Sequence, residues 1–230
     1  MIGTVLVVLA TPCVAVAVAV LLFLNPIWVG FDQGRSDVAQ LTGYTPAQVS
    51  QVTGSILSDL VFGPPNFDVT VNGAPVLDVH ERSHMADVRN VLMDLGLVAL
   101  LAALILVATG LASRGAWWFW RAVQAGGKVL VCGVVVVGLA FGFFFDQAFL
   151  LFHEIFFAPG TYMFDVRTEK LVQLFPDQFW SETSVAIAVA VLALALIVVF
   201  AAGRVAGRAA VAAPTSRAAL PALTPPGGSQ

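Results

Sequence analysis

The sequence predicts an all-α membrane protein with four transmembrane helices and a small extracytoplasmic cap. Hydrophobic residues make up 59% of the 230 residues and charged residues only 11%, whereas soluble domains carry about 25% charged residues. Four apolar stretches are long enough to cross the ~30 Å hydrocarbon core of a bilayer. We therefore expect one membrane domain at 1–203, with spans at about 4–24, 88–111, 129–147 and 185–202.

The first span, 4–24, is an uninterrupted apolar run. A cleaved signal peptide is the alternative reading. However, no basic residue precedes the run, the run is too long for a signal peptide, and it continues past any small-residue cleavage site. We expect an uncleaved helix in which Pro12 is tolerated, as proline often is in lipid.

The polar segment 25–87 is expected to fold into an ordered cap. Thr45, Pro46 and Gln48 form the pattern of an N-cap, a first-turn proline and a capping-box glutamine. Apolar residues then recur on one helical face, which predicts an amphipathic helix to about residue 62. These residues are Val49, Val52, Ile56 and Leu60.

A β-hairpin is possible in the second half of the cap. The residues 67–71 and 75–79 flank Asn72-Gly73, a pair that favours a tight two-residue turn between antiparallel strands. A solvated loop is the alternative structure for this stretch.

The distribution of charge predicts the orientation in the membrane. The loop 112–128 and the tail 204–230 carry basic residues and no acidic ones, whereas the segments 25–87 and 148–184 carry more acidic than basic residues. By the positive-inside rule both termini are then cytoplasmic, and the two acidic segments face outward. The proline-rich tail 204–230 is expected to be disordered. The net charge of −3 argues against a nucleic-acid partner.

Two histidine motifs hold the residues most suited to catalysis, and both lie in the outer segments. His84 has polar neighbours at helical spacing, while His153 lies beside a carboxylate among phenylalanines. An imidazole fixed by a carboxylate is a common general base. The supporting candidates are Glu81, Arg82, Asp87, Arg89 and Glu154. Asp94, further along the second span, can equally form an ion pair with Arg89.

A zinc metalloprotease is the first alternative. His80-Glu81-x-x-His84 has the H-E-x-x-H spelling, in which two histidines bind zinc and the glutamate acts as base. Against it, His80 directly follows the expected hairpin strand and is therefore not expected to be helical. A non-catalytic membrane scaffold is the second alternative, in which both outer histidines only bond to loop backbone.

The two motifs resemble those of the bacterial lipoprotein intramolecular transacylase family. The resemblance covers roughly residues 4 to 203. It is carried by Glu81-Arg82-x-His84-Met85-x-Asp87-Val88-Arg89, by Phe152-His153-Glu154-Ile155-Phe156-Phe157, and by Leu171-Val172-Gln173-Leu174-Phe175-Pro176-x-x-Phe179. The sequence departs from the family in the stretch 158–162, where the family often has an Asn/Asp-rich turn and a tryptophan, and in its proline-rich tail.

The resemblance implies an acyltransferase that needs no cofactor and acts on diacylglyceryl lipoproteins within membrane lipid. The sn-2 acyl chain would move to the α-amino group of the lipoprotein's N-terminal cysteine and leave a lyso-form lipoprotein. The family uses two essential histidines, which match His84 and His153. On this hypothesis His153 is the base and His84 assists the oxyanion or the leaving oxygen, although the roles can be exchanged. Asp87 and Glu154 would orient the rings, and Glu81 and Arg82 would brace the site or contact the substrate.

Overall fold

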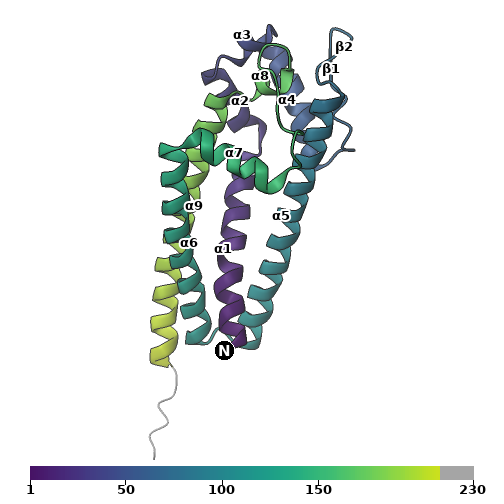
Figure 1. Ribbon diagram of the computed structural model, residues 1–230. Helices are drawn as coiled ribbons and strands as arrows, with labels where there is room; N and C mark the ends of the chain where they lie inside the picture. Colours follow the sequence, from purple (N-terminus) through teal and green to yellow (C-terminus); the bar gives the residue numbers. More distant parts are fainter. Residues whose placement is uncertain (213–230) are drawn as a thin grey trace, which may run out of the picture.

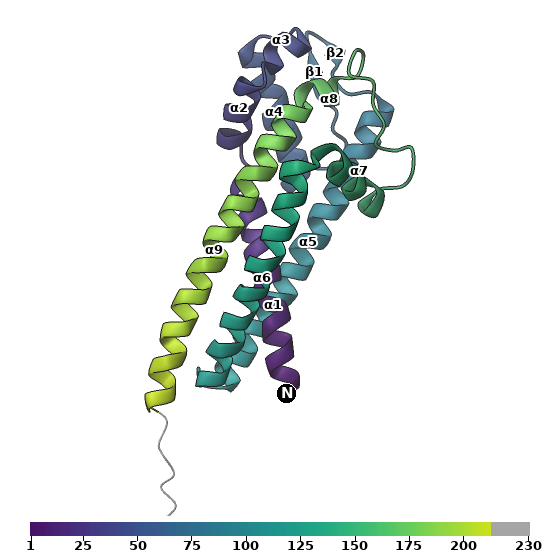
Figure 2. The same cartoon turned by 60° about the vertical axis from the view of Figure 1, so that its left-hand side comes forward.

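The computed structural model describes residues 1–212 of the chain, in which four long apolar helices run side by side beneath a cap of short elements (Figure 1). These helices are α1 (Ile2–Phe23), α5 (Val79–Ala112), α6 (Trp117–Phe143) and α9 (Asp177–Ala212), and each is long and apolar enough to cross a membrane. The predicted fold class is confirmed. Residue 1 and the end of α9 lie at the end of the bundle opposite the cap (Figure 2).

The helix α1 is central to the bundle because it packs against α5, α6 and α9. Small residues allow the closest approaches, as is usual between helices in lipid. Gly126 of α6 lies against α1, where an added Cβ would stand 2.7 Å from the Thr11 Cβ and 2.7 Å from the Val8 carbonyl oxygen. The next residue, Gly127, faces α9 in the same way, and its added Cβ would stand 2.9 Å from the Val199 Cγ2.

Two helix ends differ from the expected positions. The third expected span, 129–147, is interrupted at Phe144, where α6 ends and α7 (Phe145–Phe156) begins in a new direction. The helix α9 continues to Ala212, so residues 204–212 are helical and not part of a disordered tail. Alanine is the strongest helix former, and the first helix-breaking proline of the tail is Pro214. The remainder of that tail lies outside the described residues.

The cap surrounds a hydrophobic core formed by α2 (Pro26–Arg35), α3 (Val38–Thr42), α4 (Pro46–Val61) and α8 (Lys170–Leu174) together with the first turns of α5. The predicted amphipathic helix is confirmed as α4. Its Thr45 side chain accepts a hydrogen bond from the Gln48 amide, and the reciprocal bond completes the capping box. All four residues of its predicted apolar face are buried in the core.

The predicted hairpin is also confirmed, but its strands are shorter than expected. The strands β1 (Thr70–Val71) and β2 (Ala74–Pro75) pair in antiparallel register, with Val71 opposite Ala74. Asn72 and Gly73 have φ angles of 53° and 80°, the left-handed pair that a type I′ turn requires. The second strand does not reach residue 79, because Asp78 caps the N-terminus of α5 and the helix begins at Val79.

A buried polar clasp joins the cap to the start of α9. The Thr183 hydroxyl donates to the Asp32 Oδ2 over 2.6 Å and accepts from the Trp28 indole Nε1 over 3.1 Å. Burial raises the pKa of the Asp32 carboxyl, and the hydrogen bond from Thr183 opposes this shift only in part. Beside the clasp, Arg35 pairs with Glu182 at 2.6 Å. The cap is thereby fixed to the bundle by groups from α2.

The tight approach at Gly126 predicts a specific sensitivity to substitution. We expect Gly126→Ala to lower the free energy of unfolding by about 1–3 kcal/mol, since the new methyl group overlaps α1 backbone and cannot be relieved by a side-chain rotation. Gly133→Ala in the same helix is the control, because its Cβ meets nothing within 4 Å. Thermal unfolding in detergent compares the two variants. Equal midpoints would contradict the prediction.

Candidate active site

Two histidines that are far apart in the sequence, His84 and His153, face each other in the structure. His84 lies in the second turn of α5, and His153 lies in the last turn of α7. Their ring centroids are 6.1 Å apart, and the ring planes differ by only 19°. A substrate group that binds between or beside the two rings would therefore lie close to both imidazoles.

The start of α5 determines the position of His84. The Asp78 carboxylate accepts a hydrogen bond from the Glu81 amide over 2.8 Å, and this capping box fixes the first turn of the helix. The next residue after His84, Met85, is part of the cap core. His84 itself is 6% exposed, between the rings of Phe157 and Phe164 at 4.8 and 5.3 Å. Its Nδ1 is buried and has no hydrogen-bond partner.

His84 is in an environment that favours the neutral imidazole. The first turns of α5 are polar and form part of the cap, outside the apolar part of the helix. Burial, together with repulsion from His153 and His80, lowers the pKa of His84 to about 4. At neutral pH the ring therefore carries one N–H donor and one free lone pair, and it can act as a base or as a neutral donor.

His153 has a defined tautomer. Its Nδ1 lies 2.8 Å from the Phe149 carbonyl oxygen, and a carbonyl can only accept, so Nδ1 carries the proton. In the neutral ring the lone pair is then on Nε2, the nitrogen that can take a proton from a substrate. Aromatic rings surround it as expected, although Phe156 packs on Phe152 and not on His153. The contacting rings are Phe149, Phe152, Phe157 and Tyr162, at 4.4, 5.5, 5.4 and 5.3 Å.

The Glu81 carboxylate joins the start of α5 to the segment that follows the histidine pocket. It is 2% exposed, its Oε1 accepts from the Leu171 amide over 2.6 Å, and its Oε2 accepts from the Asp78 amide over 2.7 Å. Leu171 is in α8, directly after the loop that carries Tyr162 and Phe164. Of the two roles expected for Glu81, the structure favours bracing over contact with substrate.

The remaining supporting candidates lie away from the histidine rings. The Arg89 guanidinium donates to the carbonyl oxygens of Asp59 and Leu60 over 2.6 and 3.1 Å, and so caps the C-terminal end of α4. Arg82 approaches Asp68 near the hairpin at 3.8 Å.

The two carboxylates expected to orient the rings do not do so. Asp87 is half-buried and Glu154 is exposed. Among the hydrogen bonds of residues 1–212, none joins either carboxylate to a histidine, since His153 bonds to backbone and the His84 Nδ1 is unpaired. The expected ion pair of Asp94 with Arg89 is likewise absent from the described part of the chain.

His80 is helical, contrary to expectation, but the arrangement around it does not support a zinc site. Its Nε2 donates to the Gly160 carbonyl over 3.2 Å, and its Nδ1 lies 3.5 Å from a Glu169 carboxylate oxygen. The Glu81 carboxylate, the base in the zinc reading, is occupied by two backbone amides. Within the described residues, no group of three or more His, Cys, Asp and Glu side chains could hold a metal ion.

Sequence reasoning missed two aromatic walls of the site. Tyr162 and Phe164 come from the loop between α7 and α8, which turns at Gly160 with a φ of 87°, and they lie against His153 and His84. The only available signal was their position shortly after the turn residues Pro159-Gly160, since Tyr162 follows Gly160 by two residues and Phe164 by four. Both residues lie in a loop, which lacks the helical or strand periodicity from which the direction of a side chain can be predicted.

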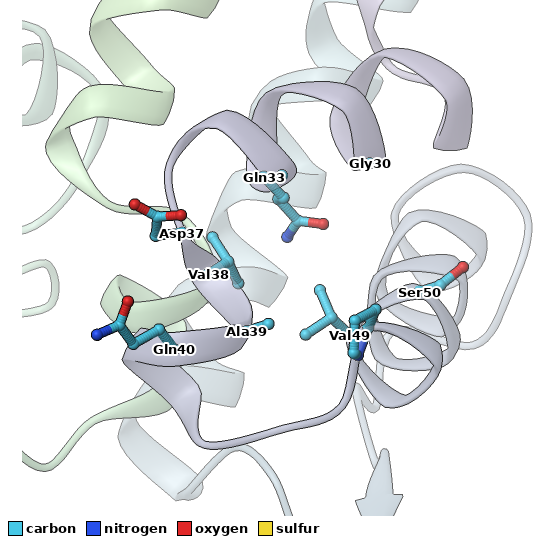
Figure 3. Close-up of a pocket in the computed structure, with 10 residues that line it drawn as sticks. Gly30, Gln33, Asp37, Val38, Ala39, Gln40, Val49 and Ser50 are labelled. Atoms are coloured by element: carbon cyan, nitrogen blue, oxygen red, sulfur yellow. The ribbon is translucent and has the colours of Figure 1, made fainter.

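A larger hollow in the cap is separate from this cluster. It has a volume of about 350 Å³ and lies between α2, α3 and α4, where Gln33, Asp37, Val38 and Val49 line it (Figure 3). None of the residues around the two histidines lines this hollow. The hollow therefore does not coincide with the pair of imidazoles, which forms the candidate active site.

Comparisons with known proteins agree with this architecture. The model of the family "Lipoprotein intramolecular transacylase Lit" matches residues 3–180. The solved structure of the lipoprotein intramolecular transacylase Lit from Bacillus cereus aligns with a TM-score of 0.77 and 17% sequence identity, covering 91% of this chain and 97% of that chain. Two structures of the Bacillus cereus protein with a single histidine replaced, by arginine or by alanine, align with TM-scores of 0.71 and 0.72 at 17% identity. These alignments cover 91% of this chain and 93% and 94% of the solved chains. No curated protein matches the sequence.

The bonds of Glu81 predict how the cap responds to its loss. We expect Glu81→Ala to lower the free energy of cap unfolding by about 3 kcal/mol, because two backbone amides lose their acceptor and one of them is buried. Hydrogen exchange at the Leu171 amide measures the opening directly. Arg82→Ala is the matched control, since its exposed ion pair is worth at most about 1 kcal/mol. Equal exchange in both variants would show that Glu81 is not a brace.

Proposed function

The chain belongs to the lipoprotein intramolecular transacylase family of membrane acyltransferases, and on that premise we propose a specific reaction for it. The sn-2 acyl chain of a diacylglyceryl lipoprotein moves to the α-amino group of the same lipoprotein's N-terminal cysteine. The product is a lyso-form lipoprotein with an N-acylated terminus. The partners are therefore diacylglyceryl lipoproteins together with the membrane lipid that holds them.

The observation that carries this proposal is the pair of imidazoles 6.1 Å apart within aromatic walls. Acyl transfer from an ester to an amine must remove a proton from the nitrogen and supply one to the leaving oxygen. Both tasks suit an imidazole side chain. Two such rings beside one substrate allow one to handle the proton while the other stabilises charge on oxygen.

The proposed step follows from the tautomer of His153. The neutral α-amine attacks the sn-2 ester carbonyl, and the new C–N bond forms as the proton on nitrogen passes to the His153 Nε2. The N–H of neutral His84 bonds to the carbonyl oxygen while that oxygen carries the negative charge. The C–O bond to glycerol then breaks, and His153 returns the proton to the leaving oxygen. The enzyme ends in its starting protonation state.

The aromatic walls support the intramolecular character of the reaction. The nucleophile and the ester belong to one molecule, and the bilayer already holds its acyl chains at the protein surface. The main requirement on the site is therefore to fold the head of the substrate into a reactive pose, which is worth several orders of magnitude in rate. Phe157 contacts both histidine rings, so it limits how the substrate can lie between them.

The two histidines are expected to be essential. We predict that His84→Ala and His153→Ala each reduce formation of N-acylated lyso-lipoprotein by at least about 10²-fold, the usual contribution of a general acid or base. Mass spectrometry of lipoprotein N-termini from cells expressing each variant measures this. His80→Ala, one turn earlier in the same helix, is the control and retains activity. Unchanged product in both alanine variants would reject the mechanism, and loss of activity with a chelator and in His80→Ala would favour zinc chemistry instead.

For the orientation, we propose that both termini are cytoplasmic and that the cap faces outward. The segments at the end of the bundle opposite the cap carry basic residues and no acidic ones, whereas acidic residues outnumber basic ones in the cap. Gln51 of α4 and Ala112 at the end of α5 are exposed at opposite ends. In a chain whose native cysteines are replaced by alanine, Gln51→Cys should react with a membrane-impermeant maleimide on intact cells. Ala112→Cys should react only after lysis. The reverse pattern would overturn the orientation.

A further inference from the structure

An apolar groove lies between α6 and α9, below α7. Its volume is about 250 Å³. The lining residues follow helical spacing on both helices, so the groove runs along the two helices. The main ones are Val134, Gly138 and Phe141 of α6, and Val185, Ala188 and Leu192 of α9.

Small residues from both helices line the middle of the groove. A Cβ added at Gly138 would meet only the Ala188 Cβ, at 3.9 Å, so the two helices are in contact here through small residues and a larger side chain would fill the groove. Further along the helices Leu130, Val191 and Ala195 form a buried cluster. The lining of the groove therefore extends from Phe141, which packs against Phe145 of α7, toward this cluster.

A row of aromatic rings connects the groove to the histidine pair. Starting from His153, the ring centroids of Phe149, Phe145 and Phe141 follow one another at 4.4, 5.3 and 6.1 Å. Phe141 lines the groove. Trp180 of α9 lies 5.9 Å from Phe149 and covers the same row from the other side. A continuous row of apolar rings thus leads from the His153 imidazole to the groove.

We propose that this groove holds the acyl chain that is transferred, an inference that rests on the proposed function. The chain is bonded to the carbonyl at His153, and the aromatic row is the apolar path that leads from this point into the groove. A chain gains little hydrophobic free energy on leaving lipid for a protein surface, since both are apolar. The groove therefore acts through position. It aligns the carbonyl by holding the chain that is bonded to it.

Filling the groove should change which chain is transferred. The experiment uses the full-length protein in vesicles with two synthetic diacylglyceryl lipopeptides, which carry either an octanoyl or a palmitoyl group at sn-2. We expect Gly138→Leu to lower transfer of palmitoyl relative to octanoyl by about tenfold, because the longer chain can no longer lie in the groove and its carbonyl is misplaced. Ala188→Leu narrows the groove from the opposite helix and should shift the ratio in the same direction.

Gly133→Leu is the matched control, because its side chain would enter open space on the same helix and should leave the ratio as in the unmodified protein. Equal loss for both chain lengths in the two groove variants, or an unchanged ratio, would overturn the inference and leave ordinary lipid as the occupant of the groove. If the unmodified protein transfers neither chain, the proposed function itself fails. The two failures are therefore distinguishable.

Discussion

One buried carboxylate connects the two sides of the reactive pocket. The Glu81 carboxylate accepts a hydrogen bond from the Asp78 amide at the start of α5. It also accepts one from the Leu171 amide at the start of α8. His84 is on the helix that this carboxylate fixes, and Tyr162 and Phe164 are on the loop that leads to Leu171. An unpaired buried charge is costly, and this one is stabilised by backbone amides from two distant segments. Glu81 thus helps to fix the separation of the pocket walls, together with His80, whose Nε2 bonds to the Gly160 carbonyl oxygen in the same loop.

The pocket is unusual in how little charge it contains. Both imidazoles lie among phenylalanine rings, and neither is bonded to a carboxylate within residues 1–212. For His84, burial among these rings favours the neutral imidazole over the cation. A backbone carbonyl orients His153 in place of the more common acidic partner. This arrangement suits a reaction whose ester and amine are both uncharged before they combine.

The sequence was sufficient for those features that depend on local patterns. The four apolar runs, the capping box at Thr45 and the Asn72-Gly73 turn each follow from residues close together in the chain. The histidine motifs were also found, because a polar group at the end of an apolar run is conspicuous. The predictions that were wrong concerned features that depend on contacts between residues far apart in the sequence. The role of Arg89 requires the end of α4 nearby, and the break at Phe144 falls within a run of phenylalanines that contains no proline.

The length of α5 has a consequence for the depth at which the reaction occurs. A helix of 34 residues rises ~51 Å, which exceeds the ~30 Å hydrocarbon thickness. His84 lies eleven residues, ~16 Å, before Leu95, where the part of α5 without charged residues begins. The residues between them, Val88 and Leu92 among them, pack against the core of the cap. A reaction at His84 would therefore take place at the level of the cap, and the rigid helix fixes the height of the imidazole above the stretch that suits lipid.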